Sequence, residues 1–254
     1  MRRDLSVALL QRIEQDLGGL RPPFFCWFLL ATYLSQRLAF CREIGSDRGM
    51  EQPDDSLEQS ARDEGYLRIA GVDEVGRGPL AGPVTAAAVI LPPTGYPQGL
   101  NDSKKLSAKK RAALAEEICQ VAEVSIAEAS VEEIDSINIL KASHLAMERA
   151  VAALDPPPDY LLIDGNLIPA GLEIAAQAVI KGDGKSVSIA AASIVAKETR
   201  DRCMVDLAQQ FPGYGWEKNA GYPSKQHRTA LEELGVTPHH RKSFKPVHKI
   251  LYQE

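Results

Sequence analysis

Short apolar runs alternate with longer amphipathic stretches over the last three quarters of the chain. Residues 84–91 and 160–163 are nearly continuous apolar runs, which is typical of buried strands. Residues 67–72 alternate apolar and other positions, which predicts a strand with one apolar face. Two further strands are expected over residues 124–127 and 174–180. Strands that come first and then mix with helices predict an α/β domain with a mixed sheet (α+β).

Four segments with helical periodicity are expected over residues 108–121, 138–154, 185–210 and 223–234. Ser107 is the predicted N-cap of the first helix. The apolar faces of the first two helices are predicted to hold Leu114, Ile118 and Val121, and Leu140, Leu145, Met147 and Val151. The third helix ends at Phe211-Pro212-Gly213, and Pro223 fits the first position of the fourth.

The first 66 residues differ in character from the rest, so we expect an extension (residues 1–66) before the main domain (residues 67–254). Helices are expected over residues 6–17 and 24–40, followed by a polar linker over residues 45–56. The most apolar stretch, residues 24–34, is too short to span a bilayer, which takes about 20 residues. Two prolines interrupt its start and no small-residue cleavage site follows, so we interpret it as a packed helix and not as a signal peptide.

The formal net charge of −5 argues against a nucleic-acid binder held by charge alone. The charge is uneven, because residues 43–65 carry a net −6 and residues 215–254 a net +3. The basic end could meet a polyanion, or could be a solvated surface with no partner. The four cysteines form no Cys-x-x-Cys pair, which excludes the usual zinc spacing and indicates reduced thiols in a cytosolic protein.

The segment Gly71-Val-Asp-Glu-Val-Gly-Arg-Gly-Pro-Leu-Ala-Gly-Pro83 carries the strongest chemical signal. It places Asp73 and Glu74 at the end of a strand, on opposite faces, and follows them with Gly76-Arg77-Gly78. Clustered carboxylates usually need a divalent cation, and an arginine between glycines suits a closely approaching phosphate. The combination points to phosphodiester chemistry. The alternative is a tight turn with an exposed arginine.

Asp164 and Asp183 each follow an apolar run, where a sheet offers a carboxylate to a cleft. Either could instead be a turn or capping residue. If the four acids meet, they could hold two divalent cations about 3.5–4 Å apart, which stabilise the entering and leaving oxygens of a phosphodiester. Mg²⁺ prefers such oxygen ligands, and Mn²⁺ can replace it.

Five further motifs follow in order: Asn-Asp-Ser-Lys-Lys-Leu-Ser (101–107), Leu-Leu-Ile-Asp-Gly-Asn (161–166), Val-Ile-Lys-Gly-Asp (179–183), Ala-Ala-Ser-Ile-Val-Ala-Lys-Glu-Thr-Arg-Asp (191–201) and Gly-Tyr-Pro (221–223). With the 71–83 segment they closely resemble bacterial ribonuclease HII, the type 2 ribonuclease H, over about residues 67–247. The resemblance implies a ribonuclease-H-like fold, with a C-terminal helical region that closes over the hybrid. Some members also carry an N-terminal helical extension.

The resemblance also implies roles for single residues. Asp73, Glu74, Asp164 and Asp183 would be the catalytic, metal-binding carboxylates, with two Mg²⁺ or Mn²⁺ ions in the active complex. The substrate-binding residues would be Gly76, Arg77, Gly78, Lys104, Lys181 and Tyr222. Among these, the Gly-Arg-Gly and Tyr222 would recognise the RNA–DNA junction. Tyr222 could instead staple the following helix, and the lysines could be merely exposed.

Ser193 and Asp201 lie on the long helix and would orient the acid cluster, although a core serine and a solvated aspartate are equally simple explanations. The sequence His239-His240-Arg241-Lys242 resembles the family's C-terminal basic patch, which we interpret as binding the nucleic-acid backbone. The chain has Ala220 where relatives commonly have lysine before Gly-Tyr-Pro. Lys218 could supply that contact.

The implied activity is endonucleolytic hydrolysis of the RNA strand of RNA–DNA hybrids. It includes cleavage 5′ to ribonucleotides embedded in duplex DNA, leaving 3′-hydroxyl and 5′-phosphate ends, in ribonucleotide repair and DNA replication. We expect a cytoplasmic monomer that binds no membrane. Type 3 ribonuclease H is the nearest competing enzyme, and the intact Gly-Arg-Gly and Tyr222 favour type 2. Two competing hypotheses lie outside the enzymes: a module that binds hybrids without cutting them, and a membrane-tethered interaction protein.

Overall fold

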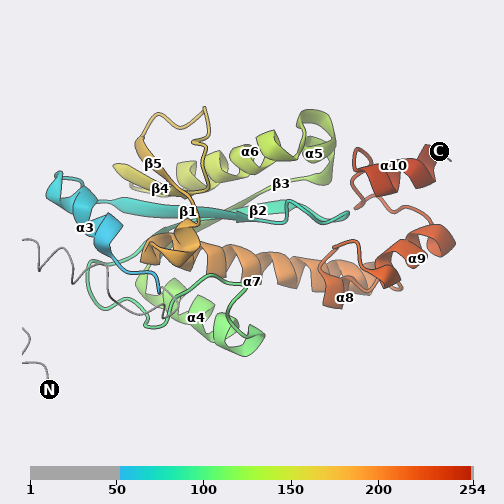
Figure 1. The fold of residues 1–254 in the computed structure, drawn as a ribbon, viewed down its shortest axis with the longest axis horizontal. Helices are drawn as coiled ribbons and strands as arrows, with labels where there is room; N and C mark the ends of the chain where they lie inside the picture. The colour runs from blue at the N-terminus through green and yellow to red at the C-terminus, as the bar shows by residue number, and fades with distance from the viewer. Residues whose placement is uncertain (1–51, 253–254) are drawn as a thin grey trace, which may run out of the picture. The chain divides into compact units, whose positions relative to one another are not determined.

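The computed structural model describes residues 52–252, which form a five-stranded mixed sheet with helices on both faces (Figure 1). The strands are β1 (Ile69–Val75), β2 (Val84–Ile90), β3 (Glu123–Ala129), β4 (Tyr160–Asp164) and β5 (Ala175–Val179), in the order β3-β2-β1-β4-β5. β1 pairs antiparallel with β2 and parallel with β4, and β5 is parallel to β4. The predicted mixed sheet is therefore confirmed. The helices expected over residues 6–17 and 24–40 lie outside the described residues.

One face of the sheet is covered by α5 (Val131–Ile137) and α6 (Ile139–Ala152). The other is covered by the long helix α7 (Val187–Gln210), which α4 (Ala108–Val121) backs (Figure 1). Three shorter helices, α8 (Trp216–Asn219), α9 (Lys225–Leu234) and α10 (Lys245–Tyr252), gather near the end of α7. They form the expected C-terminal helical region, while α3 (Ser56–Asp63) lies at the opposite end of the sheet.

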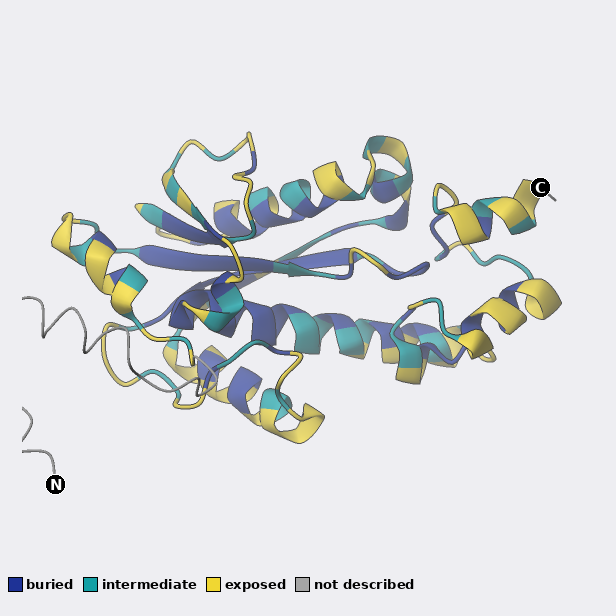
Figure 2. Cartoon of the chain, in the orientation of Figure 1, coloured by how far each residue is buried: buried dark blue, intermediate teal, exposed yellow. Residues whose placement is uncertain are grey.

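The central strand β1 is buried on both faces, and not on one as the alternation predicted (Figure 2). Leu67, which the sequence assigns to this strand, precedes it and is 83% exposed. Ala70 and Val72 pack in the core beneath α6, whereas Ile69 faces α7. Small residues suit both faces of β1, because a helix packs against each face of the sheet. β1 also continues through both acids of the 71–83 segment instead of ending before them.

The four predicted helices are present, and the differences from the prediction lie at their ends. Ser107 caps α4 as expected, its hydroxyl accepting from the Lys110 amide at 3.3 Å. Val121 and Leu140 are exposed, so their assignment to apolar faces is wrong. Each lies at a helix end, beyond the reach of the packing partner. Pro223 does not begin α9, because Ser224 caps it by accepting from the His227 amide at 3.1 Å. The short helices α5, α8 and α10 were not predicted.

The segment before β1 packs on the main domain, although the sequence assigns it to the extension. Residues 54 and 186 form a parallel β-bridge, and Ala61 of α3 lies in the core with Ile189. Glu58 is buried, and its carboxylate accepts from the Ser186 hydroxyl at 2.6 Å and the Ser188 amide at 2.9 Å. These contacts connect α3 to the start of α7. Within the described part of the chain, no helix is long and apolar enough to cross a membrane.

Candidate active site

The four predicted acids come together at one edge of the sheet because of strand register. β1 and β4 are parallel neighbours in which Val72 pairs with Ile163. Asp73 and Asp164 are the next residues of these strands, so they emerge side by side. The turn that carries Asp183, Gly182–Gly184, follows β5 and returns to this edge, where the Gly182 amide donates to Asp164 Oδ1 at 2.7 Å.

Asp73 and Glu74 point to opposite faces of β1, as successive residues of a strand must. Asp73 faces α7, where Ser193 hydrogen bonds its carboxylate, and is only 6% exposed. Glu74 lies on the other face, 3.2 Å from the exposed guanidinium of Arg77. The predicted orientation of the two acids is therefore confirmed. Among the described residues, a cationic partner pairs with Glu74 and not with Asp73.

The acids raise one another's proton affinity. Burial raises the pKa of Asp73 well above its usual range, and the charges of Glu74, Asp164 and Asp183 raise it further. Burial also raises the pKa of Glu74, against the lowering effect of Arg77. For Asp183, burial comes first and the nearby Asp102 and Asp164 charges second in raising the pKa. An edge with this much buried negative charge would be stabilised by cations.

These residues suit hard divalent cations by their donor chemistry. All four side chains offer carboxylate oxygens, and the loop beside them contributes the oxygens of Asp102. Among the described residues, no group of three or more histidine, cysteine, aspartate or glutamate side chains is arranged to coordinate a metal ion without further ligands. The Gly182 amide occupies one oxygen of Asp164, and Asp183 turns toward Asp102. Mg²⁺ retains waters and takes substrate phosphate oxygens, so a complete protein cage is not required.

The loop after β2 brings a fifth acid that the sequence analysis missed. Asp102 hydrogen bonds the Asp183 carboxyl, and Lys104 lowers the pKa of Asp183 by its charge. The next residue, Ser103, is buried, and its hydroxyl lies 2.9 Å from the hydroxyl of Ser193. Asp102 also accepts from the Lys104 amide at 2.9 Å, which is an ordinary turn bond. In the sequence it therefore looked like a turn residue only.

The Gly-Arg-Gly turn lies against Tyr222, although the two are far apart in the sequence. A Cβ on Gly78 would be 3.1 Å from Cε1 of the Tyr222 ring, so the ring covers this glycine. Gly76 has φ +99°, and a Cβ there would be 2.2 Å from Nε of Arg200. Packing and backbone conformation thus require glycine at position 76, whereas a side chain at position 78 would displace the Tyr222 ring by a few tenths of an ångström. The Tyr222 ring remains 43% exposed, available to a ligand.

Two buried arginines hold this turn, and the sequence analysis assigned neither to this task. The Arg241 guanidinium donates to five carbonyls, those of Gly76, Arg77, Pro79, Gly82 and Pro83, at 2.6–3.1 Å. The Arg200 guanidinium donates to the carbonyls of Ala81, Pro83 and Ala220 at 2.9–3.1 Å. Burial lowers the pKa of Arg241 to about 9 and also lowers that of Arg200.

The predicted basic patch at residues 239–242 is wrong for two of its members. His240 and Arg241 are fully buried, so they cannot contact a nucleic-acid backbone. Arg200 could have been found, because Ala196, Met204 and Leu207 lie on the same buried side of α7 and helical spacing places Arg200 among them. No comparable signal marks Arg241, which lies in a segment without periodicity.

Other proposed residues divide into those near the acids and those away from them. Ser193 lies beside Asp73, as expected. The Asp201 carboxylate pairs with Arg111 at 3.2 Å and with Lys197, and not directly with one of the four acids, so its orienting role stays a prediction. Lys181 is exposed with φ +56° next to Gly182, at the acid edge. Ala220 has φ +47° and gives its carbonyl to Arg200, so this position helps shape the turn before Tyr222.

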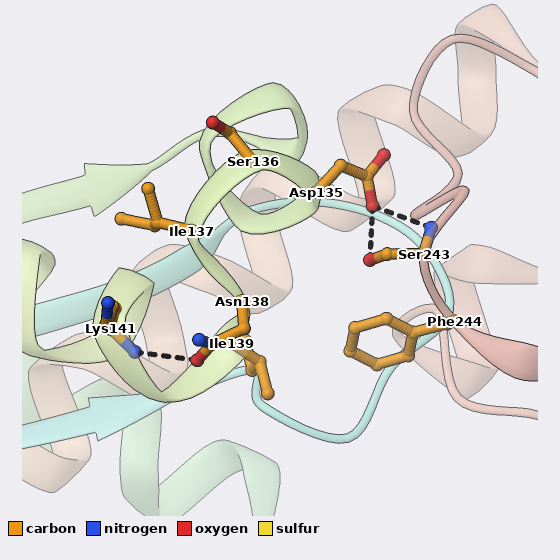
Figure 3. A pocket seen from close by; sticks show the side chains of 8 residues that line it. All are labelled: Asp135, Ser136, Ile137, Asn138, Ile139, Lys141, Ser243 and Phe244. Carbon is orange, nitrogen blue, oxygen red and sulfur yellow. Dashed lines mark hydrogen bonds between the residues drawn. The ribbon is translucent and has the colours of Figure 1, made fainter.

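The cavity of about 510 Å³ in Figure 3 lies elsewhere, between α5, the start of α6 and the segment before α10. None of the predicted site residues lines it. Asp135 closes one side by accepting from the Ser243 amide at 2.9 Å and hydroxyl at 2.6 Å (Figure 3).

A central mixed sheet with carboxylates on neighbouring strands, flanked by an arginine and an exposed aromatic ring, defines a nuclease of the ribonuclease-H-like class. The family model described as "Ribonuclease HII" matches residues 70–247. A ribonuclease HII of Ruegeria sp. (strain TM1040) is 75% identical over 206 residues, 81% of this chain and 90% of that protein. A ribonuclease HII of Paracoccus denitrificans is 62% identical over 205 residues, 81% of this chain and 98% of that protein.

The chain is also similar in structure to solved ribonucleases H. The ribonuclease H2 of Pyrococcus horikoshii OT3 is 28% identical with a TM-score of 0.65, covering 74% of this chain and 98% of that one. A ribonuclease HIII (Bst) solved with Mn²⁺ has a TM-score of 0.61 at 20% identity, covering 82% of this chain and 76% of that one, and shows likeness of fold alone. The chain belongs to the ribonuclease HII family. It is a ribonuclease H, an endonuclease that acts on the RNA of RNA–DNA hybrids and depends on divalent metal ions.

Proposed function

We propose that this ribonuclease H also cuts 5′ to single ribonucleotides embedded in duplex DNA, leaving 3′-hydroxyl and 5′-phosphate ends. The observation that carries the proposal is the contact between Gly78 and the Tyr222 ring next to the acid edge. A rigid turn and an exposed ring meet where the scissile phosphate would lie, so one surface can present both the reacting phosphate and the neighbouring sugar. Repair of misincorporated ribonucleotides and removal of RNA primers are the corresponding cellular tasks.

The four acids would have different roles in binding the cations, according to their positions. Asp73 and Asp164, side by side on the two central strands, would hold cations most directly. Glu74 and Asp183 would complete the two sites from either side. Two Mg²⁺ or Mn²⁺ ions bound there would stabilise charge on the attacking and leaving oxygens. Ser193, hydrogen bonded to Asp73, would keep that carboxylate in one orientation.

Substrate selection would come from the backbone and a few cations. The 2′-hydroxyl distinguishes RNA from DNA, and the peptide groups of Gly76, Arg77 and Gly78 are candidates to bond it. Tyr222 would stack on the adjacent deoxyribose. Arg77, Lys104 and Lys181 are exposed near the acids and would contact phosphates. Lys218, also exposed, would take the place of the lysine that relatives commonly carry at position 220.

The test compares two substrates under the same conditions. One is a DNA duplex with a single embedded ribonucleotide, and the other is a long RNA–DNA hybrid, each end-labelled and incubated with Mg²⁺ or Mn²⁺. We expect cleavage of both, with one product band from the first that ends on the 5′ side of the ribonucleotide. Tyr222→Ala should reduce cleavage of the embedded ribonucleotide about tenfold more than cleavage of the hybrid, through the loss of one stacked contact of about 1–3 kcal/mol. Equal losses on both substrates would contradict the junction role.

We further propose that the enzyme acts as a cytoplasmic monomer, with residues 67–254 as the catalytic part and residues 1–66 as an extension of unknown role. The unpaired thiols of Cys119 and Cys203 support a reducing compartment. Light scattering of the purified full chain would measure its mass in solution. A mass of twice the chain would contradict the monomer.

A further inference from the structure

A chain of buried polar side chains lies directly behind Tyr222. The His227 ring contacts the Tyr222 carbonyl through Nδ1 at 2.9 Å. Its other nitrogen, Nε2, is 3.1 Å from the indole nitrogen of Trp216 and 3.0 Å from Nε2 of His240. His240 Nδ1 is 3.0 Å from the Thr237 amide. Trp216, His227 and His240 are essentially without solvent exposure, so this network belongs to the core of the C-terminal region.

The partners fix which nitrogen carries each proton. An indole N–H can only donate, so Nε2 of His227 must accept, and the ring proton is on Nδ1. His227 therefore donates to the Tyr222 carbonyl. The Thr237 amide likewise can only donate, so His240 carries its proton on Nε2 and points it at His227 Nε2, whose one lone pair is shared with the Trp216 indole in a three-centre contact. The network thus runs in one direction, from Thr237 through both histidines to Tyr222.

The backbone just before Tyr222 is held by Arg200 at the Ala220 carbonyl and by the Leu80 amide at the Gly221 carbonyl, and His227 extends this support to the Tyr222 carbonyl. Tyr222 is 43% exposed, and its ring contacts the turn at Gly78, which has no side chain to pack against the ring. The two preceding residues, Ala220 and Gly221, both have positive φ, so the backbone turns sharply just before the ring. The Tyr222 carbonyl also accepts from the Ser224 amide at 2.8 Å. Of these two donors to the carbonyl, Ser224 lies in the same short turn, and His227 is the one that connects the turn to the buried core.

We propose that His227 is a positioning residue that sets the preference for RNA–DNA junctions by fixing the backbone of Tyr222, and that His240 fixes the orientation of His227. The inference rests on the junction role proposed above for Tyr222. His227 touches no substrate and acts through Tyr222 alone. Loss of its N–H to the carbonyl allows the tyrosine to shift against Gly78, and displacements of about 1 Å in a positioning group can change rates about 100-fold.

The experiment measures kcat/KM on the embedded ribonucleotide and on the long hybrid, and takes their ratio. His227→Leu keeps the volume of the side chain and removes every hydrogen bond. His227→Asn places an amide nitrogen near the position of Nδ1 and loses the bonds to Trp216 and His240. Tyr214→Phe is the matched control, because Tyr214 packs in the same aromatic cluster and its hydroxyl bonds the Gly235 carbonyl, away from Tyr222.

We expect His227→Leu to lower the ratio several-fold, up to the loss of about tenfold in Tyr222→Ala, and His227→Asn to restore most of it, although both lower the unfolding temperature. Tyr214→Phe should lower the unfolding temperature and leave the ratio unchanged. The double variant His227→Leu with Tyr222→Ala should have the ratio of Tyr222→Ala alone, because both changes act on one contact. Rescue by asparagine separates positioning from a general loss of stability.

The outcomes distinguish the two proposals. If Tyr222→Ala lowers the ratio and His227→Leu does not, the positioning role is overturned and the junction role stands. If Tyr222→Ala leaves the ratio unchanged, the junction role fails, and a lowered ratio in His227→Leu then overturns the positioning role as well, since the effect does not pass through Tyr222. If asparagine restores no more than leucine does, the N–H to the carbonyl is not what His227 contributes.

Discussion

Two regions of this molecule bury charge of opposite sign, and they treat it differently. At the acid edge, Asp73 is almost fully buried among other carboxylates, with Ser193 as a neutral donor from α7. Behind the Gly-Arg-Gly turn, Arg200 and Arg241 are fully buried, and within the described chain no carboxylate is bonded to either guanidinium. Their N–H groups make nine hydrogen bonds to backbone carbonyls instead.

The two kinds of buried charge have different roles, one in stabilising the fold and the other in the proposed reaction. A guanidinium has five donors in a rigid plane, and carbonyl oxygens can satisfy all of them without a counter-charge. The arginines are therefore satisfied by the backbone and serve to fix the turn. At the acid edge, burial and the neighbouring carboxylates raise the pKa values of Asp73 and Asp183. The buried guanidinium groups are thus satisfied without a counter-charge, whereas the charged neighbours of the buried Asp73 are other carboxylates.

The largest expected effect comes from removing the central acid. Asp73→Asn should lower cleavage of either substrate by about 1,000-fold or more, because it removes several kcal/mol of transition-state stabilisation by bound cations. The same variant should unfold at a higher temperature than the natural chain in the absence of metal, since a buried like-charge contact is gone. Binding of labelled hybrid in Ca²⁺ should survive. Retained turnover, or a lower unfolding temperature, would contradict the contrast drawn above.

Removal of a buried arginine behind the Gly-Arg-Gly turn should lower the stability of the protein. Arg241→Met removes a donor from five carbonyls, of which only that of Pro83 keeps another among the described residues, from Arg200. We expect the free energy of unfolding to fall by about 3–5 kcal/mol, as for other buried charged groups. Arg241→Lys should recover little, because an ammonium cannot replace the planar fork. The exposed neighbour Lys242, changed to Met, is the control and should lie within about 0.5 kcal/mol of the natural chain. Urea unfolding measures all three, and a similar loss in the control would refute the role of the carbonyl bonds.

A smaller effect should appear on acidification. Burial lowers the pKa of His240 from 6.5 to about 3 and also lowers that of His227. Between these values the unfolded chain binds more protons than the folded one. The stabilisation is therefore complete above about pH 6.5 and is lost progressively as the pH falls toward 3. For His240 the loss at pH 5 is about 2 kcal/mol.

The raised pKa values of the carboxylates act in the opposite direction, so the comparison must isolate the histidine. His240→Gln keeps a donor toward His227 and cannot titrate. Urea unfolding between about pH 7.5 and pH 5 should show a flatter dependence in this variant than in the natural chain. Identical dependence in the two would mean that the histidine network does not govern stability in this range.

Much of the acid edge could be predicted from the sequence. The strands that carry Asp73 and Asp164 are short apolar runs with strong local signals, and the acids stand out at their ends. That the two emerge side by side was decided by the parallel pairing and register of β1 and β4. The partners of Asp201 were not predicted, because spacing along a helix gives the direction of a side chain only roughly. Which cation would pair with its carboxylate depended on Arg111 of another helix.

The sequence by itself determined the types of the main elements and the mixed α/β class, because these depend on local periodicity, while the four acids were predicted from the resemblance to ribonuclease HII. Only the tertiary structure decided that Arg200, His240 and Arg241 are buried and hold the turn and Tyr222 in place. Charged and polar residues are usually exposed, and of these three only Arg200 has a local sign of burial, the helical spacing of its buried neighbours. The burial of the two arginines depends on carbonyls supplied by segments more than 100 residues away, which come together only when the chain folds.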